Sequence, residues 1–109
     1  MYFKDAARAI VMLAEAPLPD IKMVNYLVAG PSPAASAQEL ADTVRAKVPG
    51  ARVELRVDEQ LQTVVDNLAA RRLDDHVARQ EWGWRHEYNQ EHMVDDFLRE
   101  LKVHPQRYT

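Results

Sequence analysis

The side chains best suited to chemistry in this sequence are four histidines, two of which lie beside glutamates as His86-Glu87 and Glu91-His92. A zinc site on a helix uses two histidines four residues apart, or a similarly compact set of imidazole, thiolate and carboxylate ligands. The two histidine-glutamate pairs do not match this spacing, and the chain contains no cysteine. We therefore expect solvated surface histidines and no metal site.

Two adjacent pairs of carboxylates, Asp74-Asp75 and Asp95-Asp96, could share a proton in acid-base catalysis. Neighbouring residues on a helix point about 100° apart, so such pairs rarely share a proton. Helix capping and a solvated helix face explain these residues better.

Nucleophiles and phosphate-binding loops are also missing from the pattern. Ser32 and Ser36 lie in a loop that has neither a nucleophile-elbow sequence nor a suitable base and orienting acid. The three glycines, Gly30, Gly50 and Gly83, are isolated, so they do not form a glycine loop that could bind a phosphate. No catalytic set stands out.

Trp82 and Trp84 flank Gly83, and paired indoles can stack on a sugar or a base. Large aromatic residues beside the end of a helix more often serve as packing anchors that fasten the next helix to the core. We expect this packing role for both tryptophans, and a left-handed conformation at Gly83 that ends the helix before it.

Periodicity predicts the helices that position these residues. The first helix has an apolar face and ends before Pro17, while Val11 and Met12 lie off that face, as if a second partner covered them. Its face consists of Phe3, Ala6, Ala7, Ile10, Leu13 and Ala14. Ser36 and Glu39 form a capping box at the start of a second helix. Three further helices are predicted: over residues 61–68, from Asp74 or Asp75 to Glu81, and from the cap Asn89 to Leu101. Residues 69–72 are predicted to connect the first of these helices to the second.

Two segments are predicted to be strands. The apolar run from Met23 to Ala29 is typical of a strand covered on both faces, and the alternation from Arg52 to Val57 is typical of a half-exposed edge strand. A strand, a helix and a strand in this order predict a right-handed βαβ unit. The expected fold class is α/β or α+β, with two short parallel strands and four to five helices in a single domain over 1–103, followed by a loose tail over 104–109.

Composition narrows the class of protein. Apolar residues make up 47% of the 109 residues and charged residues 28%, a balance typical of a globular domain. The net charge is −3 with both signs interspersed, which argues against nucleic-acid binding. The apolar runs are too short for a membrane-spanning helix or a signal peptide. Together with the absence of cysteine, these features predict a cytoplasmic protein without membrane, metal or nucleic-acid partners.

Four motifs follow one another through nearly the whole chain. Residues 1–6 contain Tyr-Phe-Lys-Asp-Ala at the entry to a helix, residues 25–30 read Asn-Tyr-Leu-Val-Ala-Gly, and residues 36–41 read Ser-Ala-Gln-Glu-Leu-Ala. Residues 72–84 combine an Asp-capped helix bearing Ala-Arg with a final Trp-Gly-Trp. In this order they resemble the C-terminal part of extended short-chain dehydrogenase/reductases, the NAD-dependent epimerase/dehydratase family.

The resemblance implies that the cofactor-binding and catalytic residues of the family lie outside this chain. In the family, a glycine-rich turn on a parallel sheet binds NAD, and a Tyr-x-x-x-Lys pair with a serine or threonine carries out proton and hydride transfer. None of Tyr2, Tyr26, Tyr88 and Tyr108 is followed by a lysine four residues later. The expectation is a substrate-side subdomain without its N-terminal NAD-binding domain, with no cofactor and no catalytic or cofactor-binding residue of its own.

Within the family the resemblance is greatest to the L-threonine 3-dehydrogenase branch, and nucleotide-sugar epimerases and dehydratases are further away. In that branch the stretch matching residues 58–69 typically reads Arg-Gln and then Asp-Ser-Trp-Pro, and it helps to wall the substrate pocket. Here Gln62 and Asp66 match, whereas Asn67 and Leu68 replace the serine and the tryptophan. By resemblance, Asp66, Asn67 and Leu68 are the candidate substrate-binding residues, and the substrate itself is left open.

Two classes of function follow. In the first, the chain is a noncatalytic substrate-binding part of a dehydrogenase or epimerase, and its partner is the missing NAD-binding domain. In the second, it is a self-associating structural or interaction module derived from such an enzyme, and it forms a homodimer because an exposed strand edge and a spare helix face can pair with a second copy. An independent enzyme of this size would need a site that the sequence does not show.

Overall fold

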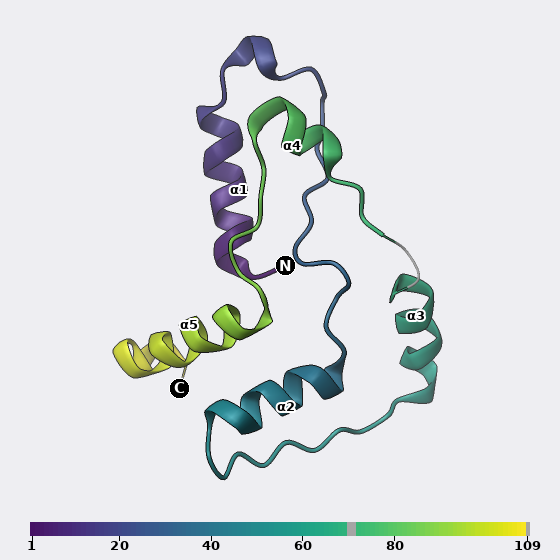
Figure 1. The fold of residues 1–109 in the computed structure, drawn as a ribbon, viewed down its shortest axis with the longest axis vertical. Helices are drawn as coiled ribbons and strands as arrows, with labels where there is room; N and C mark the ends of the chain where they lie inside the picture. Colours follow the sequence, from purple (N-terminus) through teal and green to yellow (C-terminus); the bar gives the residue numbers. More distant parts are fainter. Residues whose placement is uncertain (70–71, 109) are drawn as a thin grey trace.

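The computed structural model describes residues 1–69 and 72–108, and in these residues it contains five α-helices and two short 3-10 helices (Figure 1). In chain order they are α1 (Phe3–Glu15), η1 (Leu18–Asp20), α2 (Ala37–Lys47), α3 (Glu59–Ala69), α4 (His76–Trp82), α5 (Gln90–Val103) and η2 (Pro105–Arg107). The five predicted helices are confirmed. Residues 70 and 71 of the predicted 69–72 connection lie outside the described residues.

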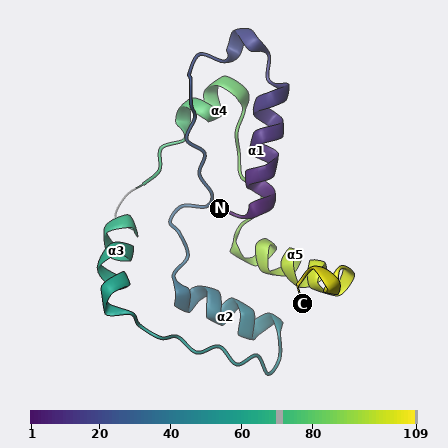
Figure 2. The ribbon, with the colours of Figure 1, turned by 180° about the vertical axis from the view of Figure 1, so that it is seen from behind.

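The predicted βαβ unit is wrong, because no β-strand is present in the part of the chain that the structure describes. Residues 23–29 and 52–57 have neither helical nor ladder hydrogen bonds. Figures 1 and 2 show them in different parts of the molecule, the first beside α4 and the second leading from α2 to α3. A strand is defined by hydrogen bonds to a neighbouring strand. Alternating or apolar side chains indicate how buried an extended segment can be, but they do not supply that neighbour.

Local capping signals place three helix ends where the sequence predicts them. The Ser36 hydroxyl accepts the N–H of Glu39 at 3.2 Å, and the Glu39 carboxylate accepts the Ser36 N–H at 2.7 Å. Asn89 accepts the N–H of His92 at 2.9 Å at the start of α5. Gly83 closes α4 with a φ of 74°, in the left-handed region that glycine adopts without steric cost.

The hydrophobic core is small and lies where α1 and α4 meet. Its buried members are Ala9, Ala78, Trp82 and Trp84. Half-buried apolar residues pack around them, namely Met12, Leu13, Ala16, Ile21, Tyr26 and Val28. The packing role predicted for the two tryptophans is confirmed, since Trp84 is fully buried and Trp82 is nine-tenths buried.

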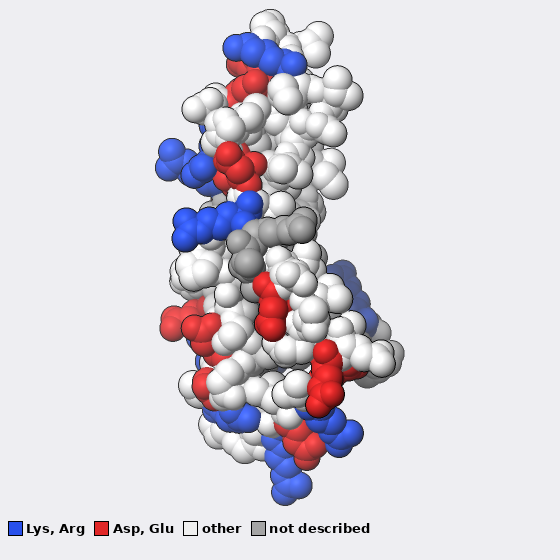
Figure 3. All heavy atoms as spheres, turned by 90° about the vertical axis from the view of Figure 1, so that its right-hand side faces the viewer, with Lys and Arg blue, Asp and Glu red and all other residues white. Residues whose placement is uncertain are grey.

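The chain is more open than a compact domain of its length. Its radius of gyration is 16.9 Å, whereas about 13 Å is typical of a compact domain of this size. Its accessible surface is 8814 Å², compared with roughly 6,200 Å² for a compact monomer of this mass. Helix α3 stands apart from the other helices in both ribbon views (Figures 1 and 2). Figure 3, which views the side where α3 lies, shows a broad area without charged side chains in its upper half.

The predicted inner face of α1 is wrong in part. Phe3, Ala7, Ile10 and Ala14 are exposed, whereas Asp5 and Ala9 are buried and Met12 and Leu13 are half-buried. No helix in the described ranges is long and apolar enough to cross a membrane. The segment predicted to be a loose tail contains η2, and the ring of Tyr108 contacts Phe97 edge-to-face at a centroid distance of 5.4 Å.

Candidate functional site

The three candidate substrate-binding residues lie together in the last turns of α3. Asp66 accepts a hydrogen bond from the Gln62 amide at 2.8 Å, and the Asn67 amide donates to the Thr63 carbonyl at 2.8 Å. The side chain of Leu68 is 62% exposed. None of the three lines the larger cavity of the molecule. They are brought together by the helix, on a surface that the rest of the described chain leaves open.

The larger cavity, with a volume of about 640 Å³, lies between residues 29–32 and the start of α4. Three arginines and a histidine line it, and Asp75 is the one carboxylate among its lining residues. These four residues are Arg72, Arg79, Arg85 and His86. Arg79 pairs with Asp75 at 3.1 Å, which leaves the cavity with a positive balance although the whole chain is acidic. Guanidinium groups bind carboxylates and phosphates, so this cavity has the chemistry of an anion-binding surface.

Sequence reasoning missed this cavity because no spacing rule joins its basic residues to the opposite wall at residues 29–32. Residues 72–84 are predicted as a family motif that includes a capped helix, and His86 is considered only as a metal ligand. The histidines that were considered as metal ligands are split: His86 lines the larger cavity, and His92 lines a smaller one of about 340 Å³ beside α5. Among the described residues, no group of three or more histidines, aspartates and glutamates could hold a metal ion.

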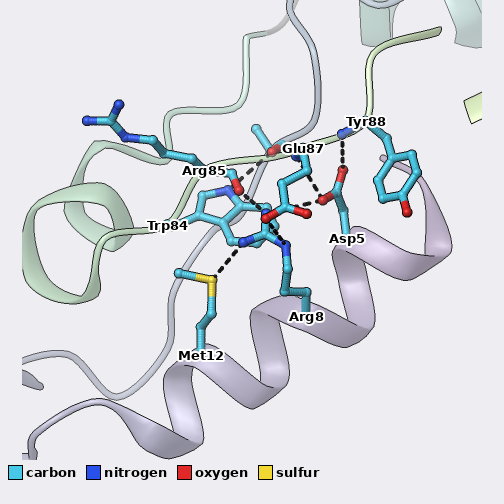
Figure 4. Close-up of polar contacts among 8 residues, drawn as sticks. Asp5, Arg8, Met12, Trp84, Arg85, Glu87 and Tyr88 are labelled. Carbon is cyan, nitrogen blue, oxygen red and sulfur yellow. Dashed lines mark hydrogen bonds and ion pairs between the residues drawn. The ribbon is translucent and has the colours of Figure 1, made fainter. Parts of the chain in front are cut away.

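A buried carboxylate on α1 fixes the backbone of residues 87 and 88, which line the smaller cavity (Figure 4). Asp5 is fully buried and accepts the backbone N–H groups of Glu87 at 2.9 Å and Tyr88 at 3.1 Å. Its carboxylate also pairs with Arg8 at 3.2 Å. Because a buried carboxylate needs several donors to offset its desolvation, this arrangement holds residues 87 and 88 in one position relative to α1.

Arg8 and Trp84 connect this network to residues that line the larger cavity (Figure 4). The guanidinium of Arg8 lies 5.1 Å from the centroid of the Trp84 ring and donates to the backbone carbonyl of Arg85. The Trp84 indole N–H donates to the carbonyl of Ala29 at 3.2 Å. Ala29 and Arg85 both line the larger cavity. Arg8 of α1 therefore holds one side of the cavity directly, through Arg85, and the other side through Trp84, on which its guanidinium packs.

A second polar cluster joins the start of α1 to α5. The Tyr2 hydroxyl donates to Asp96 at 2.9 Å, and the Lys4 ammonium pairs with Asp96 and Glu100 at 2.7 Å each. The hydrogen bond from Lys4 lowers the pKa of the nearly buried Asp96 carboxyl. Burial, followed by the hydrogen bond to Asp96, raises the pKa of the Tyr2 phenol to about 12.

This cluster predicts a loss of stability at alkaline pH. A phenol with a pKa near 10.0 in the unfolded chain and about 12 in the folded chain stabilises the fold fully below pH 10 and less as the pH rises through 12. We expect the free energy of unfolding to fall by about 1–3 kcal/mol across this range. Tyr2→Phe should reduce that fall by the share of the phenol, while the raised pKa of the Lys4 ammonium, caused by its hydrogen bonds to Asp96 and Glu100, leaves a smaller fall. Urea titrations followed by circular dichroism at pH 8, 10 and 12 measure it, and an equal fall in both proteins would contradict the assignment.

The chain is similar in sequence to known dehydrogenases. No known family profile matches it. It is 33% identical over 98 residues to mitochondrial L-threonine 3-dehydrogenase of Bos taurus, and 31% identical over 98 residues to the Sus scrofa enzyme. Each match covers 90% of this chain and 26% of the relative.

Two solved structures have the same arrangement of the backbone. A partial-consensus L-threonine 3-dehydrogenase superposes with a TM-score of 0.71 at 33% identity, covering 94% of this chain and 33% of that one. The GalE-like L-threonine dehydrogenase from Cupriavidus necator, in its holo form, gives 0.73 at 32% identity, covering 93% and 32%.

The chain thus spans about a quarter of the length of the curated relatives it matches and about a third of the solved structures. Both kinds of comparison agree on the same enzymes, and both include nearly the whole of this chain. The resemblance seen in its motifs is confirmed. The chain is therefore similar to one segment of the L-threonine 3-dehydrogenases, and the rest of those enzymes has no counterpart in the match.

Proposed function

We propose that the chain is the substrate-side part of an NAD-dependent, L-threonine 3-dehydrogenase-like enzyme and that it does not catalyse the reaction by itself. The observation that carries this proposal is the pattern of coverage: nine-tenths of the chain matches about a quarter of each curated relative. The sequence contains no Tyr-x-x-x-Lys pair, so the proton and hydride transfer of the family would depend on residues outside it.

The arginine-lined cavity supports a substrate-side role. A substrate with a carboxylate can be oriented by a planar guanidinium, which binds both oxygens at once. Arg72 and Arg85 line the cavity, and no described carboxylate forms an ion pair with either of them. The hydrogen bond from the Trp84 indole to the Ala29 carbonyl helps to hold one side of this surface in place.

Helix α3 would contribute a second wall once it is covered. Its apolar residues Leu61, Val64, Val65 and Leu68 are all more than half exposed, which is unusual for an amphipathic helix that has found its final partner. In the complete assembly, the end of α3 that carries Asp66, Asn67 and Leu68 would form part of the substrate pocket, as the family resemblance implies.

The test is to co-express this chain with the part of the Cupriavidus necator enzyme that lies outside the match, and to follow NADH formation from L-threonine and NAD. We expect no turnover from either piece alone and measurable turnover from the pair. Arg85→Ala should lower turnover by the pair about tenfold or more, while Arg56→Ala, which replaces an exposed arginine far from the cavity, should leave it unchanged. Turnover by this chain alone would contradict the proposal.

A self-associating module is the second candidate, and the large exposed surface favours it. The chain exposes roughly 2,600 Å² more than a compact monomer of its mass, an area within the range that permanent dimers bury. Light scattering coupled to size exclusion over a concentration series separates the two functions. A stable dimer that does not bind the Cupriavidus part supports this second candidate, and a monomer that binds it supports the first.

A further inference from the structure

Helix α3 is polar on one side and apolar on the other, and its polar side is satisfied within the helix. The Gln62 amide donates to Asp66 at 2.8 Å, and the Asn67 amide donates to the Thr63 carbonyl at 2.8 Å. Both ribbon views show α3 apart from the other helices (Figures 1 and 2). Its four apolar side chains, which we call the α3 seam, are all more than half exposed; they are Leu61, Val64, Val65 and Leu68.

The order of residues in the α3 seam is the same in both directions. From residue 61 to residue 68 the chain has a leucine, two polar residues, two valines, two polar residues and a leucine. The intervals of three and four residues place the leucines and valines on one face of the helix. A symmetric contact between two copies requires a surface that complements itself after a two-fold rotation. If two α3 helices pack antiparallel, Leu61 of each copy lies beside Leu68 of the other, and the valines meet at the axis.

The charges near the two ends of α3 fit the same orientation. Residues 58–59 at its start are aspartate and glutamate, and the sequence has arginines at 71–72 after its end. Arg56, before the start, already pairs with Glu54 at 3.3 Å. An antiparallel pair brings the acidic start of one helix to the end of the other that is followed by arginines, whereas a parallel pair would bring like charges together.

We propose that the α3 seam is a two-fold interface through which two copies of this chain pair, with their α3 helices antiparallel. This inference rests on the self-associating candidate described above and deepens it by naming the surface that the two copies share. Asp66 and Asn67 lie off the seam, so the polar side of α3 stays open in the pair.

The exposed apolar area around α3 is close to what a dimer needs. At roughly 100 Å² for each side chain, the seam offers roughly 400 Å² per copy, about half of the area that each partner contributes to a standard interface. Three exposed apolar residues flank α3 in the sequence: Leu55 is 45% exposed, Val57 77% and Leu73 64%. With them the area rises to roughly 700 Å² per copy. We therefore expect a dimer that dissociates on dilution.

Val65→Lys tests the interface, with Thr63→Lys on the polar side of α3 as the matched control. Both residues are exposed and β-branched, so the two changes add the same charge and alter helix propensity alike. Light scattering coupled to size exclusion over a concentration series gives the dissociation constant of the dimer. We expect Val65→Lys to raise it about tenfold or more, because two lysines beside the axis lose hydration and repel each other, and we expect Thr63→Lys to leave it unchanged.

Cysteine cross-linking tests the antiparallel orientation. The chain has no cysteine, so each introduced thiol is the only one in its copy. Chains with Leu61→Cys and chains with Leu68→Cys should form a disulfide when mixed and oxidised, and neither should do so alone. In an antiparallel pair, two copies of either residue are roughly 10 Å apart along the axis, too far for a disulfide. A cross-link between two Leu61→Cys chains would instead show parallel packing and overturn the proposed orientation.

Two outcomes separate failure of the interface from failure of the self-associating candidate. If the unchanged chain is a dimer and Val65→Lys weakens it no more than Thr63→Lys, self-association stands and the α3 seam is not the interface. If the unchanged chain is a monomer at every concentration, both fail, and the substrate-side function is untouched. Thermal unfolding of both lysine variants should match that of the unchanged chain at concentrations where all are monomers, because both side chains are exposed.

Discussion

Asp5→Ala should destabilise the protein by about 3–5 kcal/mol, enough to unfold much of it at room temperature. The substitution removes the acceptor for the N–H groups of Glu87 and Tyr88. It also removes the carboxylate that pairs with the partly buried guanidinium of Arg8. Three donors then lose their shared partner in a region where water has little access, and each uncompensated group adds its own desolvation cost.

Urea denaturation followed by circular dichroism measures this loss, and two variants serve as controls. Asp95→Ala removes a carboxylate that is 57% exposed and pairs with Lys47 on the surface, and it should cost no more than about 1 kcal/mol. Asp5→Asn keeps one oxygen acceptor and should fall between the two. If Asp5→Ala costs no more than Asp95→Ala, the buried network does not hold α1 to residues 85–88.

The parts of this fold that could be predicted from sequence are those decided within one helical turn. Ser36 and Glu39 are three residues apart and satisfy each other, so the start of α2 depends on nothing distant. The same holds for Asn89 at the start of α5 and for Gly83 at the end of α4. In each case the signal and its partner are neighbours along the chain.

Features that depend on distant partners could not be predicted. Residues 23–29 and 52–57 have the composition of strands, yet the described chain brings neither of them a neighbouring strand. The face that α1 buries was ambiguous for the same reason, because α1 is apolar on two sides. Its inner side is selected by a backbone hydrogen bond to Asp5 and by the ion pairs of Lys4, with partners 82 to 96 positions away. Charged residues on the inner side of a helix are the opposite of what periodicity assumes.

The candidate site also contains residues that could be predicted from local sequence and residues that could not. Asp66, Asn67 and Leu68 came from the family motif, and their grouping on α3 follows from their adjacency in sequence. The cavity-lining residues Arg72, Arg85 and His86 were missed, since they meet only after residues 84–88 fold back against α1. A single sequence does not show that residues 84–88 pack against α1. One available signal was the excess of arginine and histidine, five residues, over the three carboxylates in the run 72–86.

Trp84→Ala should be comparably damaging, with a loss of about 3–5 kcal/mol in the free energy of unfolding. Trp84 is the largest fully buried side chain, and it contacts Trp82 at a centroid distance of 6.0 Å and the guanidinium of Arg8 at 5.1 Å. Because the core has so few buried apolar residues, its side chains can collapse only in part into the cavity that alanine would leave. The same change should loosen the larger cavity, because the Ala29 carbonyl loses its donor.

Phenylalanine substitutions at the two tryptophans separate the hydrogen bond from the packing. Trp84→Phe loses both volume and the donor to Ala29, whereas Trp82→Phe loses similar volume and removes an indole N–H that has no acceptor among the described residues. A buried donor without a partner is itself destabilising, so removing it offsets part of the lost packing. Trp84→Phe should therefore cost about 1 kcal/mol more than Trp82→Phe in matched urea titrations. Equal losses would show that volume alone fixes the role of Trp84 and that its hydrogen bond does not position the floor of the cavity.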